Sequence, residues 1–96
     1  MPRIVISVAA LRDLEEAVAF IAAENPDAAT RLAARLRQAG AKLGDFPLMG
    51  PRLAGSRSCR AFAVPATPFW LVYRVKGDTV TILRIWHGAR GWPPVT

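Results

Sequence analysis

The sequence predicts an α+β domain, in which two helices pack on one face of a mainly antiparallel sheet. In the first half of the chain, apolar residues recur at three- and four-residue steps, which is typical of amphipathic helices. In the second half, runs of β-branched and aromatic residues are separated by Gly, Pro and Asp, which is typical of strands joined by turns. Helices grouped on one face of such a sheet define the α+β class.

The first expected elements are a short strand and a helix. Residues 3–8 are mostly β-branched and apolar, which suits a strand. From Ala9 onward the apolar positions follow a helical period, and Ser7 is placed to cap the helix start. The apolar positions of this helix are Leu11, Leu14, Val18, Ile21 and Ala22. Asn25-Pro26 ends the helix, because the residue before a proline is disfavoured in the α region.

A second helix is expected directly after this proline. Asp27 is its predicted N-cap, and its apolar stripe predicts one face packed against the rest of the domain. The stripe consists of Ala28, Leu32, Leu36, Ala39 and Leu43. Because the link between the two helices is short, they should pack as an antiparallel hairpin. The Gly and Pro content of residues 44–51 predicts a loop after the second helix.

Three C-terminal strands complete the predicted fold. Residues 59–64 suit a strand that the following prolines stop. Residues 69–75 and 79–86 are β-branched and aromatic, and the Lys76-Gly77-Asp78 turn between them predicts a β-hairpin. The expected order is an N-terminal strand, a two-helix antiparallel hairpin and a C-terminal three-stranded meander. We expect one domain that covers residues 1–96.

The composition excludes several classes of protein. With 52% hydrophobic residues the chain is too apolar for disorder, and its apolar runs are too short to span a membrane. No signal-peptide pattern is seen at the N-terminus, and the single cysteine, Cys59, excludes an internal disulfide. A reducing cytoplasm is therefore the expected location, and Cys59 is expected to be packed or idle.

The chain is strongly basic. Its 13 Lys and Arg stand against 7 Asp and Glu, which gives a formal net charge of +6 and a pI of about 11.1. Most of these cations are Arg, whose guanidinium forks onto carboxylates and phosphates. This charge favours a polyanionic partner: nucleic acid, a machine bound to nucleic acid, or an acidic protein. A basic surface that serves only solubility is the weaker interpretation.

The residues needed for common catalytic sites are nearly absent. One His, one Cys and no cluster of carboxylates predict no metal site, and no phosphate-binding glycine loop is present, so no cofactor is expected. If the chain were an enzyme, His87 would have to act as a general base beside Arg84 or Arg90. A lone His is more often structural, and we expect His87 to fix the strand end by hydrogen bonding.

The tryptophans and one strand arginine have alternative roles. Trp70 and Trp86 lie in predicted strands and are expected to pack on the sheet. Trp92 lies between a glycine and a proline in the tail, where it either packs back on the sheet or meets a partner. Arg84 is expected on a polar strand face, where it could pair with a carboxylate of a partner.

Several short segments, which together span nearly the whole chain, occur in a characteristic order. They are residues 10–14, residues 25–29, Leu43 with Phe46-Pro47 and Met49-Gly50, residues 71–75, and residues 80–85 followed by His87-Gly88-Ala89-Arg90. In order and spacing they resemble the RelE/ParE superfamily of bacterial toxins from type II toxin–antitoxin modules. The fold that this resemblance implies is a helical hairpin on an antiparallel sheet, which agrees with the periodicity.

The superfamily contains two activities. RelE-like members look like ribosome-dependent mRNA endonucleases. They resemble one another in three features: an Arg before the Leu-Val-Tyr strand motif, a second Arg past the last strand and a terminal catalytic Tyr. Here the first position is Trp70, the second is matched by Arg90, and the tail closes with Pro93-Pro94-Val95-Thr96. Loss of a phosphate-stabilising cation and of a proton-transfer group should strongly reduce nuclease activity.

The resemblance therefore implies a ParE-like toxin that inhibits DNA gyrase by binding rather than as an enzyme, and no catalytic residue is expected. A RelE-like ribosome-dependent endonuclease is the alternative. The resemblance also implies growth arrest, plasmid stabilisation and a cognate antitoxin that is acidic and partly disordered before it binds. The residues expected to bind the target are Arg84, His87, Arg90 and Trp92.

Overall fold

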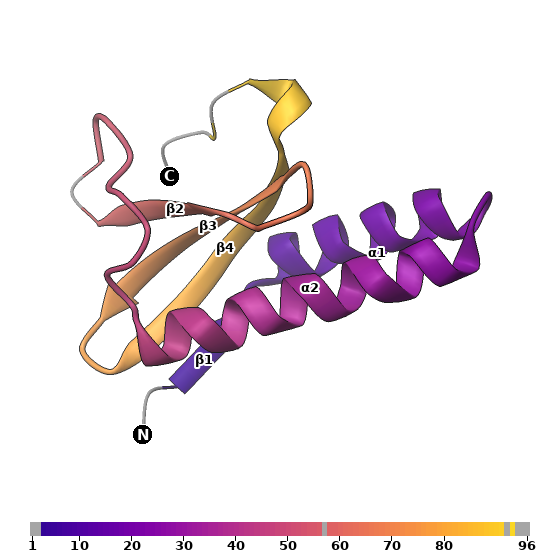
Figure 1. The fold of residues 1–96 in the computed structure, drawn as a ribbon. Coiled ribbons are helices and arrows are strands. Elements are labelled where there is room, and N and C mark those ends of the chain that lie inside the picture. The colour runs from indigo at the N-terminus through magenta and orange to yellow at the C-terminus, as the bar shows by residue number, and fades with distance from the viewer. Residues whose placement is uncertain (1–2, 57, 92, 94–96) are drawn as a thin grey trace.

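The computed structural model describes residues 3–56, 58–91 and 93 of the chain. They form one four-stranded sheet with the strand order β1-β4-β3-β2 and two helices on one side of it (Figure 1). The elements are β1 (Arg3–Ile6), α1 (Val8–Ala22), α2 (Pro26–Asp45), β2 (Cys59–Ala63), β3 (Phe69–Lys76), β4 (Thr79–His87) and the short 3₁₀ helix η1 (Gly88–Arg90). The predicted α+β class, helical hairpin and C-terminal meander are confirmed.

Both helices begin after capping residues. Ser7 Oγ accepts a hydrogen bond from the Ala10 N–H at 3.0 Å, as predicted for the start of α1. The cap of α2 is Asn25, whose Oδ1 accepts a hydrogen bond from the Ala28 N–H at 3.0 Å, so the prediction of Asp27 as the N-cap was wrong. A proline at the first helical position explains the difference, because its fixed φ already suits the helix. Asp27 lies in the first turn, where its charge complements the helix dipole.

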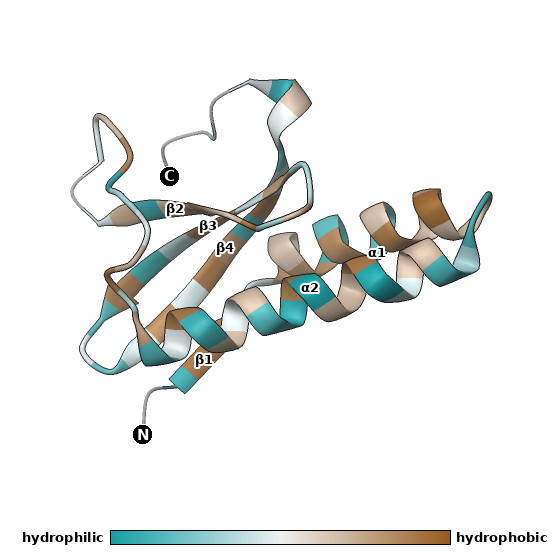
Figure 2. Cartoon of the chain, viewed as in Figure 1, coloured by the Kyte–Doolittle hydropathy of each residue, from teal (hydrophilic) through white to brown (hydrophobic). Residues whose placement is uncertain are grey.

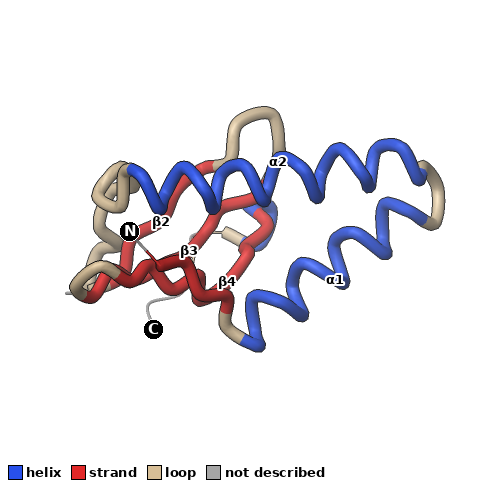
Figure 3. Tube along the Cα trace, turned by 90° about the horizontal axis from the view of Figure 1, so that it is seen from below, coloured by secondary structure: helices blue, strands red, loops and turns tan. Residues whose placement is uncertain are grey.

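The two helices diverge from their short link toward the sheet (Figure 3), and α2 is longer than predicted. Its buried positions begin at Ala29 rather than Ala28, and the helix continues past Gly44, so the loop begins only at Phe46. A Cβ atom at Gly44 would lie 2.7 Å from Ile4 Cδ1. Glycine at this position therefore lets α2 pass close to β1, which explains why a residue expected in a loop lies inside the helix.

The sheet is antiparallel except for β1, which pairs in parallel with β4. The β3–β4 hairpin turns at Gly77-Asp78, where Gly77 has a φ of 61°, a conformation that favours glycine. On β4, Ile82 and Arg84 oppose neighbouring residues of β3, so Leu83 between them is the extra residue of a β-bulge. The bulge changes the alternation of β4, and both Ile82 and Ile85 therefore belong to the core beneath the helices.

Apolar side chains form one cluster on each face of the sheet, and apolar segments follow the strands and mark stripes on the helices (Figure 2). The main cluster, between sheet and helices, consists of Ala10, Leu32, Leu36, Ala39, Leu43, Val64, Phe69, Leu71, Tyr73, Val80, Ile82 and Ile85. The second cluster consists of Leu53, Cys59, Ala61 and Val72, with Trp70, Leu83 and Trp86 packed against it. The expected packing of Trp70 and Trp86 on the sheet is confirmed, and Cys59 is packed as well.

Tyr73 anchors the loop that follows α2. Its side chain is fully buried, and its hydroxyl oxygen accepts a hydrogen bond from the Gly50 N–H at 2.8 Å. Arg60 Nη1 donates to the Gly50 carbonyl oxygen at 2.8 Å, which holds the same residue of the loop. Burial raises the pKa of Tyr73 above its ordinary value, an effect that the Gly50 hydrogen bond and the Arg60 charge oppose.

The raised pKa of Tyr73 predicts a loss of stability at high pH. In the unfolded chain the phenol ionises near its ordinary pKa of about 10, whereas in the folded protein it keeps its proton to higher pH. Above about pH 10 the unfolded state therefore binds fewer protons, and the free energy of unfolding should fall as the pH rises. Tyr73 is the only tyrosine, so tyrosinate absorbance reports on this group alone.

Tyr73→Phe is the matching variant for this pH dependence. In this variant the part of the high-pH loss of stability that accompanies ionisation of Tyr73 should disappear. At neutral pH its free energy of unfolding should be lower by about 1–3 kcal/mol, because the buried Gly50 N–H loses its acceptor. Half-titration of the folded wild-type protein at or below pH 10, with unchanged circular dichroism, would contradict the expectation.

Candidate target-binding site

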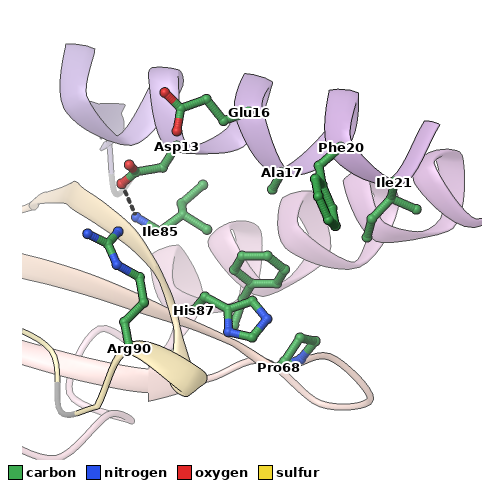
Figure 4. A pocket seen from close by; sticks show the side chains of 10 residues that line it. Asp13, Glu16, Ala17, Phe20, Ile21, Pro68, Ile85, His87 and Arg90 are labelled. Carbon is green, nitrogen blue, oxygen red and sulfur yellow. Dashed lines mark hydrogen bonds between the residues drawn. The ribbon is translucent and has the colours of Figure 1, made fainter. Parts of the chain in front are cut away.

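The end of β4 and η1 form the candidate site, and α1 faces them across a hollow (Figure 4). Arg84, His87 and Arg90, three of the four residues predicted to bind a target, lie within this short stretch. The fourth, Trp92, lies outside the described residues. The strand and the 3₁₀ turn thus bring the predicted residues to one end of the sheet.

Arg84 is held by α1 rather than presented on an open strand face. Its Nε lies 2.7 Å from Asp13 Oδ2 and its Nη2 lies 3.0 Å from Asp13 Oδ1, which makes a two-pronged ion pair. The hydrogen bonds to Asp13 raise the pKa of Arg84 above its ordinary value. The expectation that Arg84 would be open to a carboxylate of a partner is therefore corrected: a carboxylate of its own chain already occupies both prongs.

Asp13 also closes the exposed edge of β4. Pairing with β1 ends at Ile82, so the edge beyond it lacks a neighbouring strand. There Asp13 Oδ2 accepts a hydrogen bond from the Ile85 N–H at 2.9 Å, and Ser7 Oγ donates to the Leu83 carbonyl oxygen at 2.9 Å. Side chains of α1 and of its cap thus replace the missing strand and fix the end of β4 against the helix.

Trp86 lies near two guanidinium groups. The Arg84 guanidinium carbon is 5.6 Å from the centre of the indole ring, and that of Arg90 is 4.2 Å away. The indole Nε1–H donates to the Gly91 carbonyl oxygen at 3.0 Å, which ties the residue after η1 back to the strand. Arg90 is exposed, and within the described residues its guanidinium makes no hydrogen bond or ion pair. The stack therefore presents a cation with unused donors.

His87 fixes the end of the strand, as expected. Its Nδ1 accepts a hydrogen bond from the Ala89 N–H at 3.0 Å, which caps η1. Its ring meets that of Phe69 edge to face, with the centres 5.0 Å apart. His87 therefore serves as the side-chain cap of η1, with its ring held against Phe69.

The hollow beside these residues has a volume of about 350 Å³. Ala17, Phe20 and Ile21 of α1 line one side, and Pro68 and His87 line the other (Figure 4). Phe20 is 83% exposed, and together with Ala17 and Ile21 it makes this side of the hollow apolar. The described residues contain no group of three or more His, Cys, Asp or Glu that could hold a metal ion.

Asp13 is the residue of the site that the sequence did not reveal. It lies 71 positions from Arg84, on a helix whose other acidic residues are exposed, and no local pattern links the two.

Among the described helices, none is long and apolar enough to cross a membrane.

Comparison with known proteins identifies the family. The family model of the ParE toxin of type II toxin–antitoxin systems matches residues 4–92. The protein Y4kP of Sinorhizobium fredii is 37% identical over 93 residues, which cover 97% of this chain and 95% of that protein. Toxin RelE2 of Caulobacter vibrioides is 37% identical over 90 residues, 94% of this chain and 99% of that protein. Toxin RelE1 of the same organism is 32% identical over 87 residues, 88% of this chain and 91% of that protein.

A solved structure has the same fold. It comes from a chromosomal ParDE toxin–antitoxin system of P. aeruginosa and superposes with a TM-score of 0.78 at 21% identity, covering 91% of this chain and 96% of that chain. The superfamily resemblance predicted from the sequence is thus confirmed by both sequence and fold. The chain belongs to the ParE toxin family of type II toxin–antitoxin systems.

Proposed function

We propose that this toxin acts as ParE-like poisons do, by binding DNA gyrase through the end of β4 and η1. The observation that carries this proposal is the Arg90–Trp86 stack: an exposed guanidinium, 4.2 Å from an indole ring, with unused donors. The ion pair of Asp13 with Arg84 holds the strand beneath the stack. Such a preformed cation suits recognition of a carboxylate or phosphate on a partner, since little ordering entropy is lost on binding.

The surroundings of the site favour binding over RNA cleavage. Trp70, which stands where RelE-like nucleases carry an Arg, packs against the second apolar cluster and supplies no cation. Tyr73, the only tyrosine, is fully buried and bonded to Gly50, so it is not placed as a general acid or base, and Nδ1 of His87 is occupied by the cap of η1. The RelE-like alternative is supported by the names of the two Caulobacter relatives. Primer-extension stops within translated codons would identify that activity.

A cognate antitoxin is implied by the family. We infer that it is an acidic segment, partly disordered until it folds onto this basic domain, and that both proteins act in the cytoplasm. The apolar hollow beside Phe20 and the exposed guanidinium of Arg90 on η1 offer such a segment both kinds of contact.

Arg90→Ala is expected to weaken toxicity without unfolding the protein. Induction of the wild-type chain in bacteria should arrest growth, co-expression of the antitoxin should restore it, and Arg90→Ala should restore most of it without the antitoxin. Because only an exposed cation–π contact is lost, the free energy of unfolding should fall by no more than about 1 kcal/mol.

Arg12→Ala is the matched control, since Arg12 is also exposed but lies on α1 and is not among the residues that line the hollow. It removes the same charge and should leave growth arrest intact. Undiminished toxicity of Arg90→Ala would remove this residue from the site, whereas a drop in stability much larger than 1 kcal/mol would make its role structural.

A further inference from the structure

The charges of this chain are segregated between its two layers. Residues 46–96 contain seven Lys and Arg against one Asp, whereas residues 7–45, which hold both helices, contain five Lys and Arg against six Asp and Glu. Arg3, on β1, adds one more positive charge to the sheet, so the positive net charge of +6 does not come from the helical segment. Every carboxylate except Asp78 lies on or between α1 and α2. A polyanion that approaches the molecule is therefore drawn toward the sheet.

The strand register gathers three of the cations on the sheet face opposite the helices. Arg74 stands opposite Cys59, which belongs to the apolar cluster on that face. Two residues further along β3, Lys76 stands opposite Thr79, which is also the partner of Arg3 on β1. Directly opposed residues share one face of a sheet, and all three cations are exposed. We call Arg3, Arg74 and Lys76 the outer basic face.

The groups of the outer basic face suit contacts to phosphate. Arg74 and Lys76 lie two positions apart on one strand, or about 6.6 Å at a rise of 3.3 Å per residue. Beside them the register places the hydroxyl-bearing Thr79 and Thr81. The carboxylate of Asp78, the single acidic group of this half, accepts a hydrogen bond from Thr79 Oγ1 at 3.4 Å. Cations and hydroxyls are the side chains that most often contact nucleic-acid backbones.

We propose that the outer basic face binds the phosphate backbone of duplex DNA without regard to sequence. Single-stranded nucleic acid calls for exposed aromatic rings on which bases stack, and the register places no described aromatic residue beside these cations. An acidic peptide that folds on binding calls for an apolar groove, whereas the apolar neighbours that the register sets beside these cations are the fully buried Cys59, opposite Arg74, and Val5, opposite Thr81. This binding goes beyond the proposed action on gyrase, because it requires no other protein.

Fluorescence anisotropy with a labelled DNA duplex of arbitrary sequence, over a series of KCl concentrations, tests the proposal on the full chain. Neutralising three phosphates gives a slope of about −2.7 in a plot of log K against log salt. The double variant Arg74→Gln with Lys76→Gln should reduce the magnitude of this slope by about 1.8, with a similar loss for every duplex sequence. Lys76→Gln alone, next to the exposed turn, should reduce it by about 0.9.

The control is Arg31→Gln with Arg35→Gln, two exposed cations of α2 in the helical layer, which lowers the net charge equally. It should leave the slope nearly unchanged. If both double variants reduced the slope equally, binding would depend on net charge alone and not on the outer basic face, and the proposal would be overturned. Absence of salt-sensitive binding to the duplex, or binding only to an acidic peptide such as polyglutamate, would overturn it too. Gyrase inhibition can persist in each of these cases, so failure here is distinct from failure of the proposed function.

Discussion

Asp13→Ala is expected to lower the free energy of unfolding by about 2–3 kcal/mol, which would be one of the largest effects of any polar substitution in this domain. The carboxylate accepts three hydrogen bonds, two from Arg84 and one from the Ile85 N–H. The Asp13 side chain is 13% exposed and that of Arg84 is 29% exposed, so water replaces the lost partner only in part. Urea unfolding followed by circular dichroism measures the change.

Glu15→Ala is the matched control for this substitution, because Glu15 lies on the exposed side of the same helix. It should change stability by less than about 0.5 kcal/mol. Combining Asp13→Ala with Arg84→Ala should cost clearly less than the sum of the two single changes, since the two residues share one interaction. Additive effects, or an Asp13→Ala variant as stable as the control, would show that the ion pair does not hold α1 to β4.

Gly50→Ala is expected to destabilise the protein by at least about 2 kcal/mol, through overpacking and loss of a buried hydrogen bond. A Cβ atom there would lie 2.7 Å from the Ala61 carbonyl oxygen and 2.8 Å from the Tyr73 hydroxyl. The first of these is a backbone atom within β2 and cannot turn aside. The loop would have to move away from the sheet, which would break the bond between the Gly50 N–H and Tyr73.

Gly40→Ala provides the opposite expectation for the same chemical change. Gly40 lies inside α2, and a Cβ atom there would meet nothing within 4 Å. Because glycine is a poor helix former, this variant should be more stable by about 0.5–1 kcal/mol. Thermal melting of both variants checks the pair. A Gly50→Ala protein that melts with or above the wild type would mean that the loop does not pack on Tyr73 as described.

The local elements of this fold could be predicted because their signals are local. Helical periodicity, Ser7 as a cap and the Gly77 hairpin each depend on residues within a few positions of one another. Competition between adjacent signals caused the error at the second helix, where Asn25 and Asp27 both have capping side chains and the proline between them selects Asn25. Gly44 was predicted in a loop for a different reason. A glycine is needed there because Ile4 of β1 packs close to the helix, and only the folded chain reveals this contact.

The candidate site was predictable in composition but not in geometry. A basic residue past the last strand pointed to Arg90, but its stacking on Trp86 depends on how η1 turns back over the strand. The β-bulge at Leu83 determines which face of the sheet the following residues occupy, and no sequence pattern predicts it. The sequence does not predict the pairing of Arg84 with Asp13 either, since any of several acidic residues could have been its partner.

The measurement that bears most directly on gyrase as the target is the yield of cleaved gyrase–DNA complexes in a purified system. Wild-type toxin should raise this yield and inhibit supercoiling, the cognate antitoxin should reverse both effects, and Arg90→Ala should weaken both while Arg12→Ala does not. Ribosome-bound mRNA should stay intact under the same conditions. Unchanged gyrase activity together with new cleavage of translated mRNA would contradict a ParE-like action and establish the RelE-like alternative.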